Sequence, residues 1–182
     1  MDYVNILWII PFVFSIHELE EWNILKWYKT YYRNLPASTN VSIRIHIVVL
    51  ALTSFLLTGV ALAFHGTFLF SAIVVFMSAF VLLNFLQHVI WTAQLKVYSP
   101  GLVTAVICLM AVAAVNVILI TSGRVDTPFY LLVFLIIPAL MATLRVKGEM
   151  TKEVRSVHEF FIKVEKTLRI VWPGNTRNSQ DR

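Results

Sequence analysis

The chain has 182 residues, of which 58% are hydrophobic, and it carries a formal net charge of +5. This composition excludes a disordered chain and argues against an ordinary soluble domain, because apolar blocks of about 20 residues are long enough to cross a bilayer. A single cysteine, Cys108, excludes a disulfide within one chain. No segment resembles a nucleic-acid-binding module, so we expect no nucleic-acid partner.

The first predicted membrane helix covers about residues 2–22 and includes the sequence His-Glu-Leu-Glu-Glu at residues 17–21. A signal peptide would begin with basic residues and end at a small-residue cleavage site, and this segment has neither feature. Aromatic and basic side chains are mixed from Trp22 to Arg33, which is typical of a membrane–water interface. The pattern therefore predicts a helix that is retained in the protein.

Four further membrane helices are predicted, over about residues 45–64, 67–94, 100–121 and 128–145. Ser99 suits the N-cap of the fourth predicted helix and Pro100 suits its first position. The predicted fold class is all-α. It is a polytopic membrane helix bundle with five transmembrane helices, which form one domain over residues 1–146.

The remaining residues, 147–182, form a basic tail. Apolar residues recur in it at helical spacing, which predicts an amphipathic helix over residues 149–171. Charged residues interrupt its apolar stripe too often for a membrane span, because a central Lys or Arg opposes insertion by about 2.5–3.5 kcal/mol. We expect this helix to lie on the cytoplasmic leaflet or to cover the cytoplasmic ends of the bundle.

The positions of the basic residues predict the orientation in the membrane. Five spans place every Lys and Arg except Arg124 on one side. The positive-inside rule then puts the N-terminus outside and the C-terminus in the cytoplasm. The expected location is therefore an integral membrane protein in contact with the lipid bilayer.

Several unusual polar residues fall at one depth under this topology. They are His17, Glu20 and Glu21 at the end of the first predicted helix, His46 at the start of the second, Asn84 and His88 late in the third, and Tyr98 before the fourth. A shared pocket near the cytoplasmic leaflet explains this common depth, since ionisable groups beside hydrocarbon mark functional sites. His65 and His158 fall outside the layer, and Glu18 is interpreted as solvated.

Helical spacing places His17, Glu20 and Glu21 within an arc of about 100°. Histidine and carboxylate side chains on one face are ligands for a divalent metal, with zinc favoured. Asn84, on the same face as His88, would support that site. The alternatives are simpler: a polar cap at the end of a membrane helix, a bundle histidine bonded to a carbonyl group, and an amide that joins two helices.

Three motifs in order carry a family resemblance. They are His17-x-x-Glu20-Glu21, Asn84-x-x-x-His88 and Tyr98-x-Pro100-Gly101. This combination resembles the HXXEE-motif family of bacterial integral membrane proteins over about the first two-thirds of the chain. The resemblance implies a multi-pass protein of the bacterial plasma membrane with a candidate site at His17, Glu20, Glu21, Asn84 and His88. It implies no reaction, and His46 has no place in its pattern.

The favoured function is a metal-dependent membrane hydrolase. His17, His88 and one of Glu20 and Glu21 would hold zinc, and the other glutamate would take a proton from the attacking water. A site just below the interface suits a lipid or amphiphile substrate that enters from the membrane. Tyr98 and His46 would support the site.

Two alternatives remain open. One is a carboxylate-bridged di-metal redox enzyme, for which one chain supplies few ligands. The other is a proton- or cation-binding transport or sensor protein, since buried Glu and His mark such paths. A purely structural role for the polar cluster also stays open, and it would make the protein a scaffold.

Overall fold

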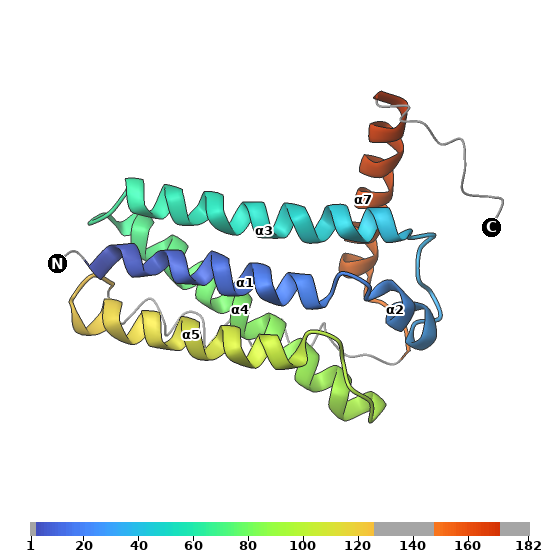
Figure 1. Ribbon diagram of the computed structural model, residues 1–182, viewed down its shortest axis with the longest axis horizontal. Coiled ribbons are helices and arrows are strands. Elements are labelled where there is room, and N and C mark those ends of the chain that lie inside the picture. The colour runs from blue at the N-terminus through green and yellow to red at the C-terminus, as the bar shows by residue number, and fades with distance from the viewer. Residues whose placement is uncertain (1–2, 126–147, 172–182) are drawn as a thin grey trace.

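The computed structural model describes residues 3–125 and 148–171, and the regular elements in these ranges are all helices (Figure 1). They are η1 (Tyr3–Trp8), α1 (Ile9–Glu20), α2 (Leu25–Tyr31), α3 (Asn40–Ala63), α4 (Phe68–Leu95), α5 (Leu102–Thr121) and α7 (Lys152–Val171). The predicted all-α class is confirmed. The fifth predicted span, residues 128–145, lies outside the described residues.

Within the described ranges, three helices are long and apolar enough to cross a membrane: α3, α4 and α5, with 24, 28 and 20 residues. Their outer faces are also apolar, and large side chains such as Leu56, Phe76 and Met110 are more than half exposed. A helix that is apolar on all sides is typical of a membrane span. These helices indicate an integral membrane protein, but the described residues do not support the predicted count of five spans.

The first predicted span, residues 2–22, differs most from the prediction. It begins as the 3-10 helix η1 and continues as α1, which has 12 residues and ends at Glu20. Pro11 lies in the first turn of α1, where its missing N–H is tolerated. After Glu20 the chain turns, with the N–H of Ile24 donating to the carbonyl of Glu21 at 2.8 Å, so that Glu21 lies in a turn and not in the helix.

The starts of α3 and α5 also differ from the prediction. α3 begins at Asn40, before the predicted residue 45, because Thr39 and Ser42 form a capping box with two bonds of 3.0 Å. α5 begins at Leu102, and Gly101 with φ +92° occupies the N-cap position. The predicted roles of Ser99 as N-cap and Pro100 as first helical residue are therefore wrong.

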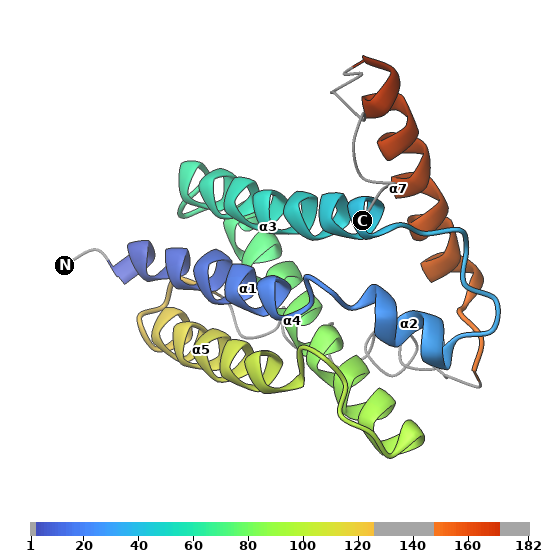
Figure 2. The same cartoon turned by 45° about the vertical axis from the view of Figure 1, so that its right-hand side comes forward.

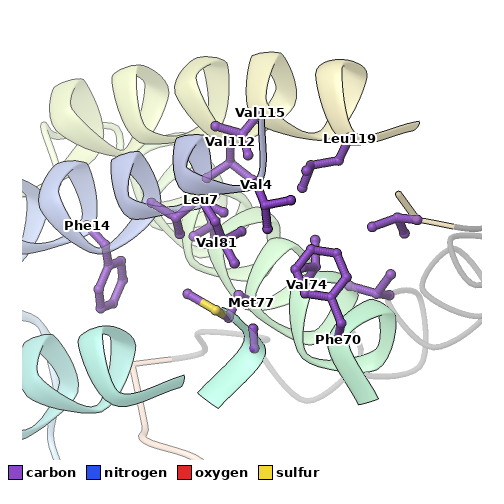
Figure 3. Close-up of a cluster of buried hydrophobic side chains, with 14 of the residues drawn as sticks. Val4, Leu7, Phe14, Phe70, Val74, Met77, Val81, Val112, Val115 and Leu119 are labelled. Carbon is purple, nitrogen blue, oxygen red and sulfur yellow. The ribbon is translucent and has the colours of Figure 1, made fainter. Parts of the chain in front are cut away.

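The bundle consists of α1, α3, α4 and α5. In it α1 packs on α3 and α5, and α4 packs on the same two helices. Figure 3 shows the core between them, where Leu7 of η1 lies near Val81 of α4 and Val112 of α5. Inside a bilayer such contacts act through close packing and interhelical hydrogen bonds, because lipid tails are as apolar as the side chains. The Asn116 amide supplies one such bond, 2.9 Å to Ser78.

α7 crosses the first half of α3 at a steep angle, as both ribbon views show (Figure 2). Its buried face consists of His158, Phe161 and Glu165. The Thr39 hydroxyl donates to Glu165 at 2.5 Å, and the His158 ring nitrogen Nδ1 lies 3.0 Å from the Ser38 hydroxyl. The predicted tail helix is thus docked on the bundle through polar contacts, while its position at a membrane surface stays a prediction.

We predict that acid loosens this docking. Burial, followed by the nearby His46, lowers the pKa of His158 from its usual 6.5 to about 4. The buried neutral ring therefore contributes its full stability above pH 6.5, and this contribution is lost as pH falls from 6.5 toward 4. Hydrogen exchange of the α7 amides, corrected for intrinsic rates, should show weaker protection at pH 5 than at pH 7.

The matched control is His158→Asn, whose amide cannot titrate but can still bond the Ser38 hydroxyl. The other titratable groups against His158 are Tyr28 and His46, with ring centroids at 5.4 and 6.5 Å. The variant should lose most of the pH dependence. The same pH dependence in both proteins would show that another group controls the docking.

Candidate metal centre

Three of the residues predicted from the sequence meet at one end of the bundle. His17 lies in the last turn of α1, Glu21 in the turn that follows, and His88 near the end of α4. His88 Nε2 lies 2.8 Å from Glu21 Oε1, and His17 Nε2 lies 3.9 Å from the same oxygen. One nitrogen or oxygen atom of each residue lies within 4.8 Å of the others, which is a group able to hold a metal ion.

The hydrogen bonds of His17 determine which of its nitrogens faces the cluster. Its Nδ1 lies 3.1 Å from the Thr104 hydroxyl, and that hydroxyl donates its hydrogen to Glu20 Oε2 at 2.5 Å. Because a hydroxyl has one hydrogen, Thr104 accepts from Nδ1–H of His17. Nε2 is then an unprotonated acceptor, and it is buried without a hydrogen-bond partner.

His88 is held in a similar way. Its Nδ1 lies 2.9 Å from the Ser99 hydroxyl, which donates to the Pro100 carbonyl at 3.4 Å. Its other ring nitrogen, Nε2, faces the Glu21 carboxylate. The distance of 2.8 Å fits a hydrogen bond from Nε2–H of His88 to Glu21, and the same two atoms are placed to bind a metal ion together.

Gly101 forms one wall of the cluster. A Cβ atom at this position would lie 2.7 Å from Glu21 Oε1, 2.8 Å from His88 Cε1 and 3.0 Å from His17 Cε1. Its φ of +92° is also in the region that favours glycine. The glycine that begins α5 therefore lets the backbone approach all three side chains at once.

Glu20 does not join the cluster. Its Oε1 accepts from the Tyr98 hydroxyl, and its Oε2 accepts from the backbone N–H and hydroxyl of Thr104. Partial burial and the bond to Glu20 raise the pKa of Tyr98, so the phenol keeps the proton that it donates. Of the two glutamates predicted as ligands, the structure brings Glu21 to the histidines and uses Glu20 to support His17 through Thr104.

Asn84 lies one turn from His88 and lines a small space together with His17 and Cys108. Its Oδ1 is buried without a hydrogen-bond partner, like Nε2 of His17. His46 is not one of the three clustered residues, and it stacks on Phe161 of α7 with 4.5 Å between ring centroids. Asn84 is therefore beside the cluster, and His46 faces the cavity that the cluster also lines.

A cavity of about 480 Å³ opens beside the cluster. Glu18, Glu21 and His88 line it together with His46 of α3 and His158 of α7. The interpretation of Glu18 as a solvated residue is wrong, since only 3% of this residue is exposed. His158 also lies in the cavity wall, although nothing in the spacing of α7 indicates that this helix packs on α3.

Three further residues of the site escape prediction from the sequence: Ser99, Thr104 and Glu18. Ser99 does carry a signal in its place beside Pro100-Gly101, but that signal equally fits helix capping. Thr104 has no signal of its own, since a threonine in an apolar helix is common.

The family model described as a protein of unknown function with HXXEE motif matches residues 8–116. The matched range includes His17, Glu21, His88 and Gly101, and it ends before α7. No curated protein and no solved structure matches the chain.

We predict that Gly101→Ala disrupts the cluster. The added Cβ would overlap the Glu21 carboxylate and both imidazole rings, in addition to the strain of a side chain at positive φ, which is about 1–2 kcal/mol. Overlap in a packed site adds roughly 1–3 kcal/mol. Thermal unfolding in detergent should therefore show a clear loss of stability.

Gly66→Ala is the matched control, because Gly66 has φ +79° but a Cβ added there would meet no atom within 4 Å. This variant carries the strain without the overlap. Equal losses of stability in the two variants would mean that Gly101 serves only the backbone turn and does not shape the cluster.

Proposed function

Since this chain belongs to the family of proteins with an HXXEE motif, whose activity is not established, we propose its function from the site: it is a metal-dependent membrane hydrolase, with zinc at His17, Glu21 and His88. One observation carries the proposal. The Nε2 atom of His17 is buried without a partner beside a carboxylate and a second imidazole. An unpaired buried acceptor is unfavourable, and a cation satisfies all three groups together.

The ligand set agrees with a catalytic zinc site. Two histidines and one carboxylate leave a fourth position open for water or substrate. Ligands at about 2.0–2.2 Å from zinc lie roughly 3–4 Å from one another, so the present separations of up to 4.8 Å need only small side-chain movements. Thr104 and Ser99 hold the far nitrogens of the two rings, which is the usual role of residues around a metal site.

The chain's own residues supply the rest of the chemistry. A divalent ion held here would polarise a carbonyl group and make water more acidic. Glu20 is less suited to take the proton, because its oxygens accept hydrogen bonds from Tyr98 and Thr104 and it lines neither the cluster nor the cavity beside it. Glu18 lines the cavity one helical turn before Glu21, and we assign it the role of proton acceptor.

A proton-binding transport or sensor protein is the second candidate. The 2.8 Å contact between His88 Nε2 and Glu21 Oε1 also accommodates a shared proton. The di-metal redox alternative has less support, because among the described residues the cluster contains one carboxylate. Metal analysis separates these candidates.

We also propose a location for the protein, based on the one-sided distribution of Lys and Arg. The chain lies in a bacterial plasma membrane, with its N-terminus outside and its C-terminus in the cytoplasm. This orientation places the ends of α1 and α4 and the start of α5 near the cytoplasmic leaflet, where Figure 1 shows them at one end of the bundle. A lipid or amphiphile then reaches the cavity from the bilayer.

We predict that protein purified in mild detergent without added metal retains about one zinc ion per chain. His17→Ala, His88→Ala and Glu21→Gln should each abolish retention, because each removes a ligand. Thr104→Val should weaken zinc affinity by roughly 10–100-fold, since it removes the support of a ligand and leaves the ligand itself. Elemental analysis and competition with a chelating dye measure these changes.

His65→Ala is the control, because His65 lies in the turn at the other end of α3, with Arg124 at 3.1 Å. Its zinc content should equal that of the unmodified protein. Zinc retained by the His17 and His88 variants, or absent from the unmodified protein, would contradict the metal site and favour the proton-binding candidate.

We predict the orientation separately. A reporter fused after Arg182 should read cytoplasmic, and a reporter inserted at Gly123, in the turn after α5, should read external. The reason is the one-sided distribution of Lys and Arg. Activity assays locate each reporter. If both reporters lie on the same side of the membrane, the predicted topology with five spans is wrong.

A further inference from the structure

The cavity beside the cluster has an unusual charge pattern. Two acidic residues, Glu18 and Glu21, line it, and none of its described lining residues is Lys or Arg. Its remaining polar groups are imidazoles, amides, an indole and a phenol. Without a metal ion at the cluster, an anionic ligand would meet these acidic residues and no Lys or Arg, which opposes its binding.

The rest of the cavity wall is apolar. Ile43, Ile47, Leu50 and Phe80 line it from α3 and α4. A second, narrower hollow of about 170 Å³ lies between α1, α3 and α4, and it shares Leu50 and Phe80 with the first. A polar end beside the cluster is thus followed by an apolar path along the inner faces of α3 and α4.

This arrangement matches an elongated ligand with one polar end. The volume of the main cavity, about 480 Å³, is that of a small-molecule site. The second hollow is narrow and lined almost wholly by apolar side chains, which suits one hydrocarbon chain. The amides of Asn84 and Gln87 can donate to a carbonyl oxygen at the polar end.

We propose that the cavity binds a single-chain amphiphile whose polar end is an uncharged ester or amide, and that the metal-free cavity discriminates against the corresponding carboxylate. The inference rests on the proposed function for the choice of a hydrolysable bond, but binding itself does not require the metal. It names the substrate class of that site: a neutral acyl amphiphile, with its carbonyl beside Glu21 and its chain between α3 and α4.

Trp91 provides the measurement, because it lines the cavity and is only 4% exposed. The test uses the full chain in detergent with the four other tryptophans changed to phenylalanine. Two probes carry the same tetradecanoyl chain, brominated near its middle. One is the methyl ester, and the other is the free carboxylate, which alkaline pH keeps ionised. Bromine quenches a nearby indole, so saturable quenching of Trp91 reports binding in the cavity.

The ester should quench saturably in both zinc-loaded and chelator-treated protein. In chelator-treated protein the carboxylate should bind at least about tenfold more weakly, a difference of roughly 1.4 kcal/mol. Equal or tighter binding of the carboxylate would overturn the inference, as would quenching that rises without saturation.

Leu50→Phe narrows the passage between the two hollows, and Val157→Phe fills the cavity from α7. Both should reduce ester binding, and the second keeps the test valid if the first fails to fold. Leu52→Phe is the matched control, since Leu52 is 63% exposed on the outer face of α3. Quenching that is unchanged in both cavity variants would also overturn the inference.

These measurements test the metal-dependent hydrolase and the amphiphile-binding cavity independently of each other. Ester binding without zinc retention would remove the metal-dependent hydrolase and leave an amphiphile-binding cavity. Zinc retention without a preference for the ester would leave the metal site and remove this substrate class.

Discussion

Every polar group that is buried near hydrocarbon must find a partner, and the structure around His17 depends on this constraint. The residue is 1% exposed, and its Nδ1 bonds Thr104 while its Nε2 points at Glu21 and His88 without a hydrogen bond. Thr104 bonds Glu20, which also accepts from Tyr98, and Ser99 bonds the neighbouring His88. His17, Glu21 and His88 together form a group able to hold a metal ion.

The connection from α4 to α5 joins the fold to the site. Ser99 bonds His88, Gly101 lies against the three clustered side chains, and Thr104 bonds both His17 and Glu20. α5 can begin here because glycine tolerates φ +92° without a side-chain cap. The same short segment therefore connects two helices and orients both imidazoles, which explains why the three motifs occur together.

The cluster and the cavity have different origins along the chain. His17, Glu21 and His88 all fall within the family match at residues 8–116. α7 lies beyond it, yet Val157, His158 and Phe161 complete the cavity wall. The candidate metal-binding group therefore belongs to the part of the bundle that the family model matches, whereas α7 gives the cavity part of its shape through polar contacts with Ser38 and Thr39.

The helical class and the apolar spans of α3, α4 and α5 could be predicted from the sequence, because hydropathy and helical periodicity act within single elements. The meeting of His17 and His88 with one of Glu20 and Glu21 could be predicted from the common depth that the predicted topology gives these residues. Tertiary packing was needed to distinguish Glu20 from Glu21, to place Ser99 against His88 rather than at a helix cap, and to bury Glu18 and His158. These outcomes depend on which helix packs against each face and where α1 ends, and residue spacing along one helix carries no information about its neighbours.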